Sequence, residues 1–152
     1  MTQCRNVASV VVCAIALLAL TGCTPEARVQ AKLVHGAVEF VICDAISVKA
    51  VRVDGYEFGA NKSVEVTLWQ LSGDSRWAPG HRLILGKTPS NWVESMQPTR
   101  PDLSANEIYL VLNSPSQTVA SDTRVATFDP RLLSEESWLT QDGHSSSAPC
   151  RA

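Results

Sequence analysis

The chain has 152 residues, of which 45% are hydrophobic and 18% charged, and its formal net charge is −2. This composition is typical of a globular protein and excludes disordered, collagen-like and coiled-coil chains, while the length predicts one domain. The basic residues are scattered singly along the chain. Because a nucleic-acid-binding protein needs a concentrated basic face, we expect no nucleic-acid partner.

The first segment has the features of a secretory signal. Residues 1–6 are polar and carry one positive charge, at Arg5, and Val7–Leu20 are almost uniformly apolar. As a helix this apolar run would span about 21 Å, less than the ~30 Å hydrocarbon core of a bilayer, so a membrane-spanning helix is disfavoured. A charged start, a short apolar run and small residues at its end predict a signal peptide.

The apolar run ends in the tetrapeptide Leu20-Thr21-Gly22-Cys23. It resembles the lipobox of bacterial lipoproteins, in which leucine stands three residues before the cysteine and small residues fill the positions between. The resemblance implies that a dedicated peptidase removes residues 1–22 by cutting between Gly22 and Cys23. It also implies that the Cys23 thiol carries a diacylglyceryl group. Two or more acyl chains, such as palmitate, give durable membrane attachment.

The anchor implies a location and a set of partners. We expect the protein on the extracytoplasmic face of the cell membrane, or of the outer membrane in an organism that has one. Residues 23–32 are expected to be the lipidated N-terminus and a short polar tether, whose nine residues after Cys23 reach roughly 15–18 Å as a coil. The expected partners are the membrane, through Cys23, and an envelope protein or glycan.

The cysteines support the same location. The chain has five, at Cys4, Cys13, Cys23, Cys43 and Cys150. The first two leave with the signal peptide and Cys23 takes the lipid, which leaves Cys43 and Cys150 in a compartment that favours disulfides. We predict that they bond and thereby staple the polar tail, residues 141–152, to the first long strand. A metal or redox pair is the alternative, which no CxxC spacing and no neighbouring histidine supports.

Residues 33–140 are expected to form the domain. Segments with strand character are 33–43, 46–53, 64–71, 82–86, 91–94, 107–113 and 124–128. An Asp54-Gly55 turn and a loop over residues 72–80 are expected between them. Six to seven short strands predict a mainly β fold, and we take an immunoglobulin-like β-sandwich as its architecture by analogy.

A short C-terminal helix is expected after the last of these strands. Asp129 can cap it with Pro130 at its first position, or Ser134 can cap it before Glu135 and Glu136, and either helix would run through Leu139. Trp138 would then lie in the helix and, like Trp69 in its strand, in the core.

The sequence contains no recognisable catalytic or metal-binding motif. The histidines, His35, His81 and His144, lack metal-ligand spacing, and there is no Gly-x-Ser-x-Gly and no Gly-rich phosphate loop. We therefore expect no catalytic residue, no cofactor and no metal. Whether the protein is an enzyme stays open, with the balance against it.

One segment is a candidate binding loop. Residues 72–82 contain Trp77 together with Arg76, His81 and Arg82. An exposed tryptophan beside cations can stack on a sugar ring or anchor a protein partner. The other interpretation folds Trp77 back as a lid over the end of the sandwich.

The leading hypothesis is a membrane-anchored extracytoplasmic lipoprotein that serves as a non-catalytic binding or interaction module. The alternatives are a small secreted hydrolase whose site assembles from distant residues, and a structural envelope protein or accessory subunit.

Overall fold

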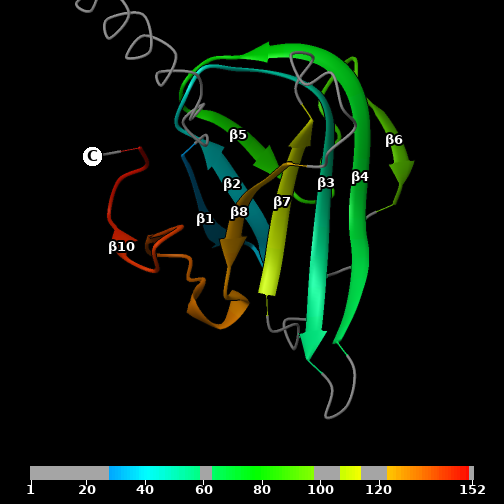
Figure 1. Ribbon diagram of the computed structural model, residues 1–152. Helices are drawn as coiled ribbons and strands as arrows, with labels where there is room; N and C mark the ends of the chain where they lie inside the picture. Colours follow the sequence, from blue (N-terminus) through cyan, green and yellow to red (C-terminus); the bar gives the residue numbers. More distant parts are fainter. Residues whose placement is uncertain (1–27, 59–62, 98–106, 114–122, 151–152) are drawn as a thin grey trace, which may run out of the picture.

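The computed structural model describes residues 28–58, 63–97, 107–113 and 123–150 (Figure 1). The expected signal peptide, the tetrapeptide that resembles a lipobox and Cys23 lie outside these residues. No helical segment in the described ranges is long and apolar enough to cross a membrane.

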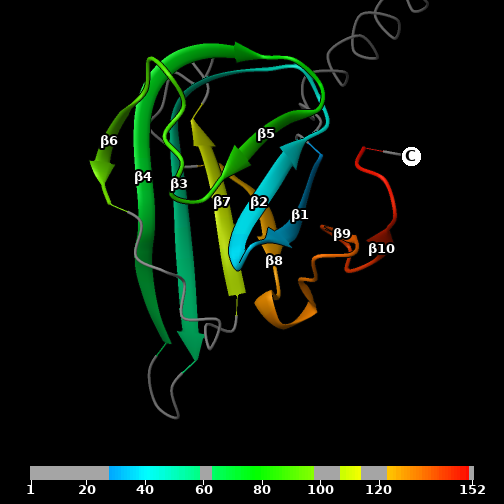
Figure 2. The same ribbon diagram turned by 180° about the vertical axis from the view of Figure 1, so that it is seen from behind.

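The described residues form two antiparallel five-stranded sheets (Figures 1 and 2). The first has the order β10-β9-β1-β2-β5 and the second the order β6-β4-β3-β7-β8. The strands of the first sheet are β1 (Val29–Val34), β2 (Ala37–Ile42), β5 (His81–Ile84), β9 (Trp138–Thr140) and β10 (Ser145–Ser146). Those of the second sheet are β3 (Ile46–Phe58), β4 (Ser63–Trp77), β6 (Val93–Met96), β7 (Glu107–Asn113) and β8 (Thr123–Phe128).

One hydrophobic core lies between the two sheets. Alternate residues of β2, namely Val38, Phe40 and Ile42, are almost completely buried. They belong to the same cluster as Val51 and Val53 of β3 on the facing sheet. Because alternate residues of a strand point to opposite faces, these two runs meet face to face. The mainly β sandwich expected from the sequence is therefore present.

The first predicted strand, residues 33–43, is in fact a hairpin. β1 and β2 pair from Val34↔Ala37 outward, around a turn in which His35 (φ 51°) and Gly36 (φ 78°) both have positive φ. Two residues of positive φ are the requirement of a type I′ hairpin turn. Since β1 starts at Val29, residues 29–32 belong to the first strand and not to the expected tether, so the domain begins earlier than expected.

Most of the predicted loop over residues 72–80 is strand, and the predicted Asp54-Gly55 turn is wrong. β3 continues through Asp54-Gly55, and β4 continues to Trp77, so that only residues 78–80 of the predicted loop lie outside a strand. The two strands pair along most of their length, from Ile46↔Trp77 to Phe58↔Ser63. Backbone pairing between two long neighbours overrides the local turn preference of Asp, Ser and Gly. Figure 2 shows the resulting hairpin extending beyond the short strands of the other sheet.

The predicted C-terminal helix is also wrong. In the described residues it is reduced to one 3₁₀ turn over Pro130–Leu132, capped by Asp129, whose carboxylate accepts a hydrogen bond from the Arg131 backbone N–H. Trp138–Thr140 instead forms β9, where Leu139 pairs with Ala31 of β1. The edge of β1 offers backbone hydrogen bonds to this segment, and Leu139 is buried in the core there. Both favour the extended conformation over a short helix.

Candidate functional site

The candidate loop does not present an exposed tryptophan. Trp77 ends β4 and is only 3% exposed. Its ring stacks on His81, with centroids 4.4 Å apart, and lies 5.5 Å from the ring of Trp92. Trp77 therefore closes the end of the sandwich core, as in the second interpretation of this segment.

The four residues of the candidate loop point in different directions. His81 packs inward, and burial lowers the pKa of its imidazole. Arg82 lies on the opposite face of β5, where its guanidinium is 5.5 Å from the ring of Trp138. Arg76 is exposed on β4. The structure thus brings Trp77 and His81 together, but it separates Arg82 from both.

A second, smaller cluster lies on the outer face of the first sheet. It contains Val41, Cys43 and Trp138, with Cys150 packed against them. The cluster has a charged border, because Lys32 Nζ lies 4.8 Å from the Trp138 ring and the buried Glu39 pairs with both Lys32 (3.9 Å) and Arg82 (3.4 Å). A second set of alternate residues in 37–43 also contains apolar side chains, namely Val41 and Cys43. Because alternate residues of a strand point to opposite faces, this pattern places both on the face opposite Phe40.

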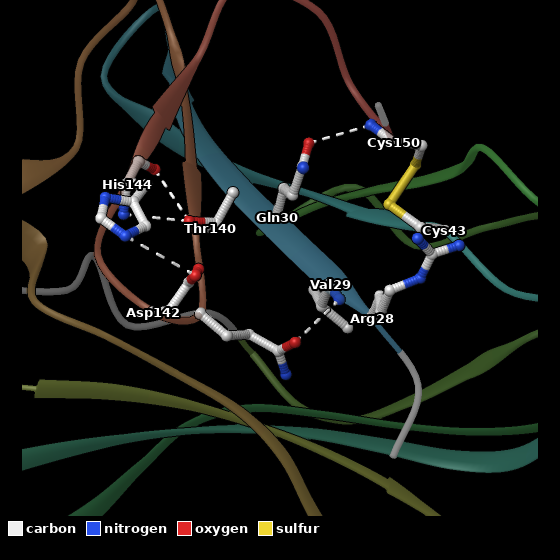
Figure 3. Close-up of a pocket in the computed structure, with 9 residues that line it drawn as sticks. Arg28, Val29, Gln30, Cys43, Thr140, Asp142, His144 and Cys150 are labelled. Atoms are coloured by element: carbon white, nitrogen blue, oxygen red, sulfur yellow. Dashed lines mark hydrogen bonds and ion pairs between the residues drawn. A yellow bond between two sulfur atoms is a disulfide. The ribbon is translucent and has the colours of Figure 1, made fainter. Parts of the chain in front are cut away.

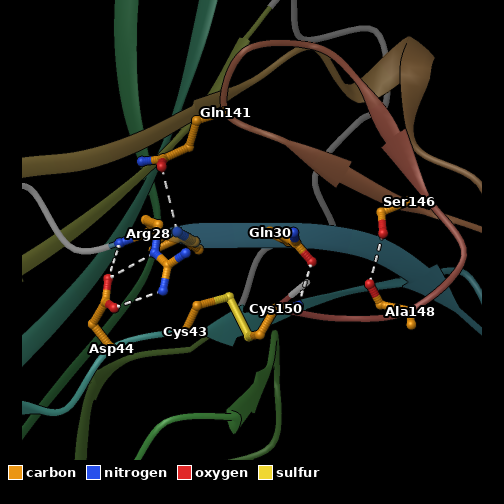
Figure 4. The surroundings of a disulfide bond; sticks show 9 residues. Arg28, Gln30, Cys43, Asp44, Gln141, Ser146, Ala148 and Cys150 are labelled. Carbon is orange, nitrogen blue, oxygen red and sulfur yellow. Dashed lines mark hydrogen bonds and ion pairs between the residues drawn. A yellow bond between two sulfur atoms is a disulfide. The ribbon is translucent and has the colours of Figure 1, made fainter. Parts of the chain in front are cut away.

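The predicted disulfide is present and holds this region together. Cys43 and Cys150 are bonded, with their Cα atoms 5.1 Å apart (Figure 4). The Cys150 backbone N–H also donates to Gln30 Oε1 at 3.0 Å. The disulfide fastens the C-terminal tail to the end of β2, and the hydrogen bond to Gln30 fastens it to β1.

A cavity of about 440 Å³ lies beside the disulfide (Figure 3). Its walls come from the start of β1, the end of β2, the β9–β10 turn and the stapled tail. The lining residues are Arg28, Val29, Gln30, Cys43, Thr140, Gln141, Asp142, His144 and Cys150. Only the two cysteines of this set are predicted from the sequence to lie together, because the other residues meet through the pairing of β1 with β9.

The β1 wall of the cavity is fixed by an ion pair. The Arg28 backbone N–H donates to Asp44 Oδ2 at 2.8 Å, and its Nη2 donates to Oδ1 at 3.1 Å. The Arg28 side chain and its backbone N–H hold the pKa of Asp44 below the usual value. The guanidinium stays largely accessible, with 58% of the side chain exposed.

The opposite wall is the β9–β10 turn. The Thr140 hydroxyl donates to the His144 carbonyl oxygen at 2.9 Å and accepts from the His144 backbone N–H at 3.0 Å. His144 Nε2 lies 3.9 Å from Asp142 Oδ2. The proximity of the Thr140 hydroxyl, the backbone N–H of Asp142 and His144 together lower the pKa of Asp142.

This turn contains a hydroxyl, an imidazole and a carboxylate, but they are not arranged as a catalytic triad. A triad needs the hydroxyl to donate to the imidazole, which then takes its proton. Here the Thr140 hydroxyl bonds to the backbone carbonyl and N–H of His144 rather than to its imidazole. Within the described residues, no three His, Cys, Asp or Glu side chains come together as metal ligands.

Comparison with known proteins gives no match to a family model, to a curated protein or to a solved structure. Function therefore has to be argued from the geometry of the site and the sequence around it.

Proposed function

We propose that this protein is an extracytoplasmic lipoprotein, anchored through lipid on Cys23, whose domain is a non-catalytic binding module. The observation that carries the binding role is the cavity of about 440 Å³ held open between β1, the β9–β10 turn and the Cys43–Cys150 disulfide. Its size falls within the range of small-molecule pockets. The disulfide fixes its walls before a ligand arrives, which lowers the entropy cost of binding.

The anchor proposal rests on the lipobox and on the disulfide, a bond typical of extracytoplasmic proteins. Because β1 starts at Val29, only residues 24–28 separate Cys23 from the first strand. Five residues span at most about 17 Å when extended. The cavity, which has Arg28 in its wall, would then lie close to the membrane surface.

An immunoglobulin-like topology is part of the proposal. The order β8-β7-β3-β4-β6 corresponds to the G-F-C-C′-C″ order of variable-type immunoglobulin sheets, and the β1–β2 hairpin corresponds to strands A and B. The chain departs from that pattern because β5 of the other sheet comes between β4 and β6. Its disulfide also joins the end of β2 to the tail rather than strand B to strand F.

The anchor is tested by metabolic labelling with a clickable fatty acid in the source cells. Wild-type protein should take up the label and Cys23→Ala should not. Cys13→Ala, which removes a thiol from the expected signal peptide, is the matched control and should label normally. Label on Cys23→Ala would contradict the anchor.

The binding role is tested by native mass spectrometry of protein isolated from those cells. We expect a small-molecule adduct on the wild-type chain and on Glu135→Trp, a change at an exposed site outside the cavity. Asp142→Trp, which places a bulky ring at the cavity rim, should lose the adduct. An adduct that survives Asp142→Trp would contradict binding in this cavity.

A further inference from the structure

A buried amide on the inner side of the cavity carries an unused hydrogen-bond donor. Gln30 is 6% exposed and lines the cavity. Its Oε1 must face Cys150, since that atom accepts from the Cys150 backbone N–H. The amide orientation is thereby fixed, and among the described residues Nε2 has no hydrogen-bond partner. Nε2 is not one of the fully enclosed unpaired atoms, so it is accessible from the cavity and can donate to an acceptor bound there.

The two rims of the cavity carry opposite charges. Figure 3 shows Arg28 on the side of the disulfide and Asp142 with His144 on the other side, with Gln30 between them. The Asp142 side chain is 73% exposed, so it is accessible to a ligand that approaches from solvent. Hydrogen bonds to a charged partner are stronger than those between neutral groups, so this arrangement favours a ligand with both signs of charge.

We propose that the cavity binds a small zwitterion of the α-amino-acid or short-peptide type. Its carboxylate oxygen accepts from Gln30 Nε2 and lies toward the Arg28 guanidinium, and its ammonium group lies toward Asp142. This proposal names the ligand class for the proposed binding function. It rests on that function because it takes the same cavity as the ligand site. It does not depend on the lipid, so fatty-acid labelling at Cys23 and ligand binding can fail separately.

The test is an NMR titration of the ¹⁵N-labelled mature chain in detergent with L-alanine and with L-alanyl-L-alanine, which separates the free amino acid from the peptide. At least one of the two should shift the amide signals of residues 28–30 and 140–144. Gln30→Glu keeps an oxygen facing Cys150 but replaces the Nε2 donor with a carboxylate oxygen, which repels the ligand carboxylate, so it should weaken binding about tenfold or more. Gln70→Glu makes the same chemical change on β4 of the other sheet and should leave the affinity unchanged.

The charge on each side is tested with blocked peptides. Asp142→Asn should weaken binding of L-alanyl-L-alanine several-fold, but it should not alter binding of the N-acetylated dipeptide, which has no ammonium group. The dipeptide amide, which lacks the carboxylate, should bind more weakly to every variant that retains Gln30. The proposal is overturned if neither probe shifts the amide signals at concentrations up to about 10 mM. That concentration exceeds even a millimolar Kd. Unchanged affinity in Gln30→Glu overturns it equally.

Discussion

The ring of Trp77 stacks on the imidazole of His81, with the two planes only 11° apart. The two residues flank the short turn between β4 and β5, and each belongs to a different sheet. Their contact therefore closes one end of the sandwich. Nε2 of His81 is buried and has no hydrogen-bond partner among the described residues, so the pair functions as apolar packing.

This packing predicts a pH dependence of stability. Burial lowers the pKa of His81, so the folded protein keeps the imidazole neutral where the unfolded chain already takes up a proton, near pH 6.5. The free energy of unfolding should fall as the pH drops through that value and level off below the folded pKa. Urea unfolding of wild type and His81→Gln at about pH 7.5 and 5.5 measures the effect. An equal decrease in both proteins would show that His81 is not its source.

The close approach of Trp92 to the backbone of β4 predicts a strict requirement for glycine. A Cβ at Gly73 would lie 2.5 Å from the Trp92 ring, whose Nε1 donates to Ser75. Gly73→Ala should reduce the free energy of unfolding by about 1–3 kcal/mol, because the indole must move.

Gly80→Ala is the comparison for Gly73→Ala. Gly80 has a φ of +84° but open space around it, so alanine there should cost only about 1 kcal/mol of backbone strain. Chemical denaturation of both variants gives the two values. A smaller loss for Gly73→Ala than for Gly80→Ala would contradict the packing of Trp92 over Gly73.

The disulfide should contribute strongly to stability. It joins residues 107 positions apart, and the chain-entropy model gives up to ~4.7 kcal/mol for a loop of about this size. The double variant Cys43→Ala, Cys150→Ala should show a large decrease in the free energy of unfolding. It should also expose Trp138, which is buried in the same cluster as Cys43, and shift its fluorescence to longer wavelength. An unchanged unfolding midpoint would contradict this contribution.

The buried Asp54 should make Arg52 indispensable. Asp54 is fully buried, and its Oδ2 accepts from Arg52 Nε at 2.7 Å, while Oδ1 has no partner among the described residues. Arg52→Met would leave a buried carboxylate without its cation, which typically costs about 3–5 kcal/mol. Adding Asp54→Leu should restore much of the loss. If the double variant is no more stable than Arg52→Met, the pairing does not explain the effect.

Some failures of the sequence analysis have the same physical cause. Asp54-Gly55 has the composition of a turn, yet both residues are inside β3 because β4 and β7 pair with it on either side. Trp138 and Leu139 were assigned to a helix, yet an open edge of β1 holds Leu139 in a strand. The local conformational preferences of a segment contribute less free energy than a ladder of backbone hydrogen bonds and burial in the core. The hydrogen-bonding partners and the burial cannot be read from a short window of sequence.

The sequence by itself determined the mainly β class and the pairing of Cys43 with Cys150, because each depends on local pattern or on a simple count. Only the tertiary structure decided that Trp77 is buried against His81 and that Arg82 turns away to Trp138. It also decided that Gln30, Asp142 and His144 border one cavity. Those contacts join strands far apart in the chain, and the register of β1 with β2 and β9 sets which side chains meet.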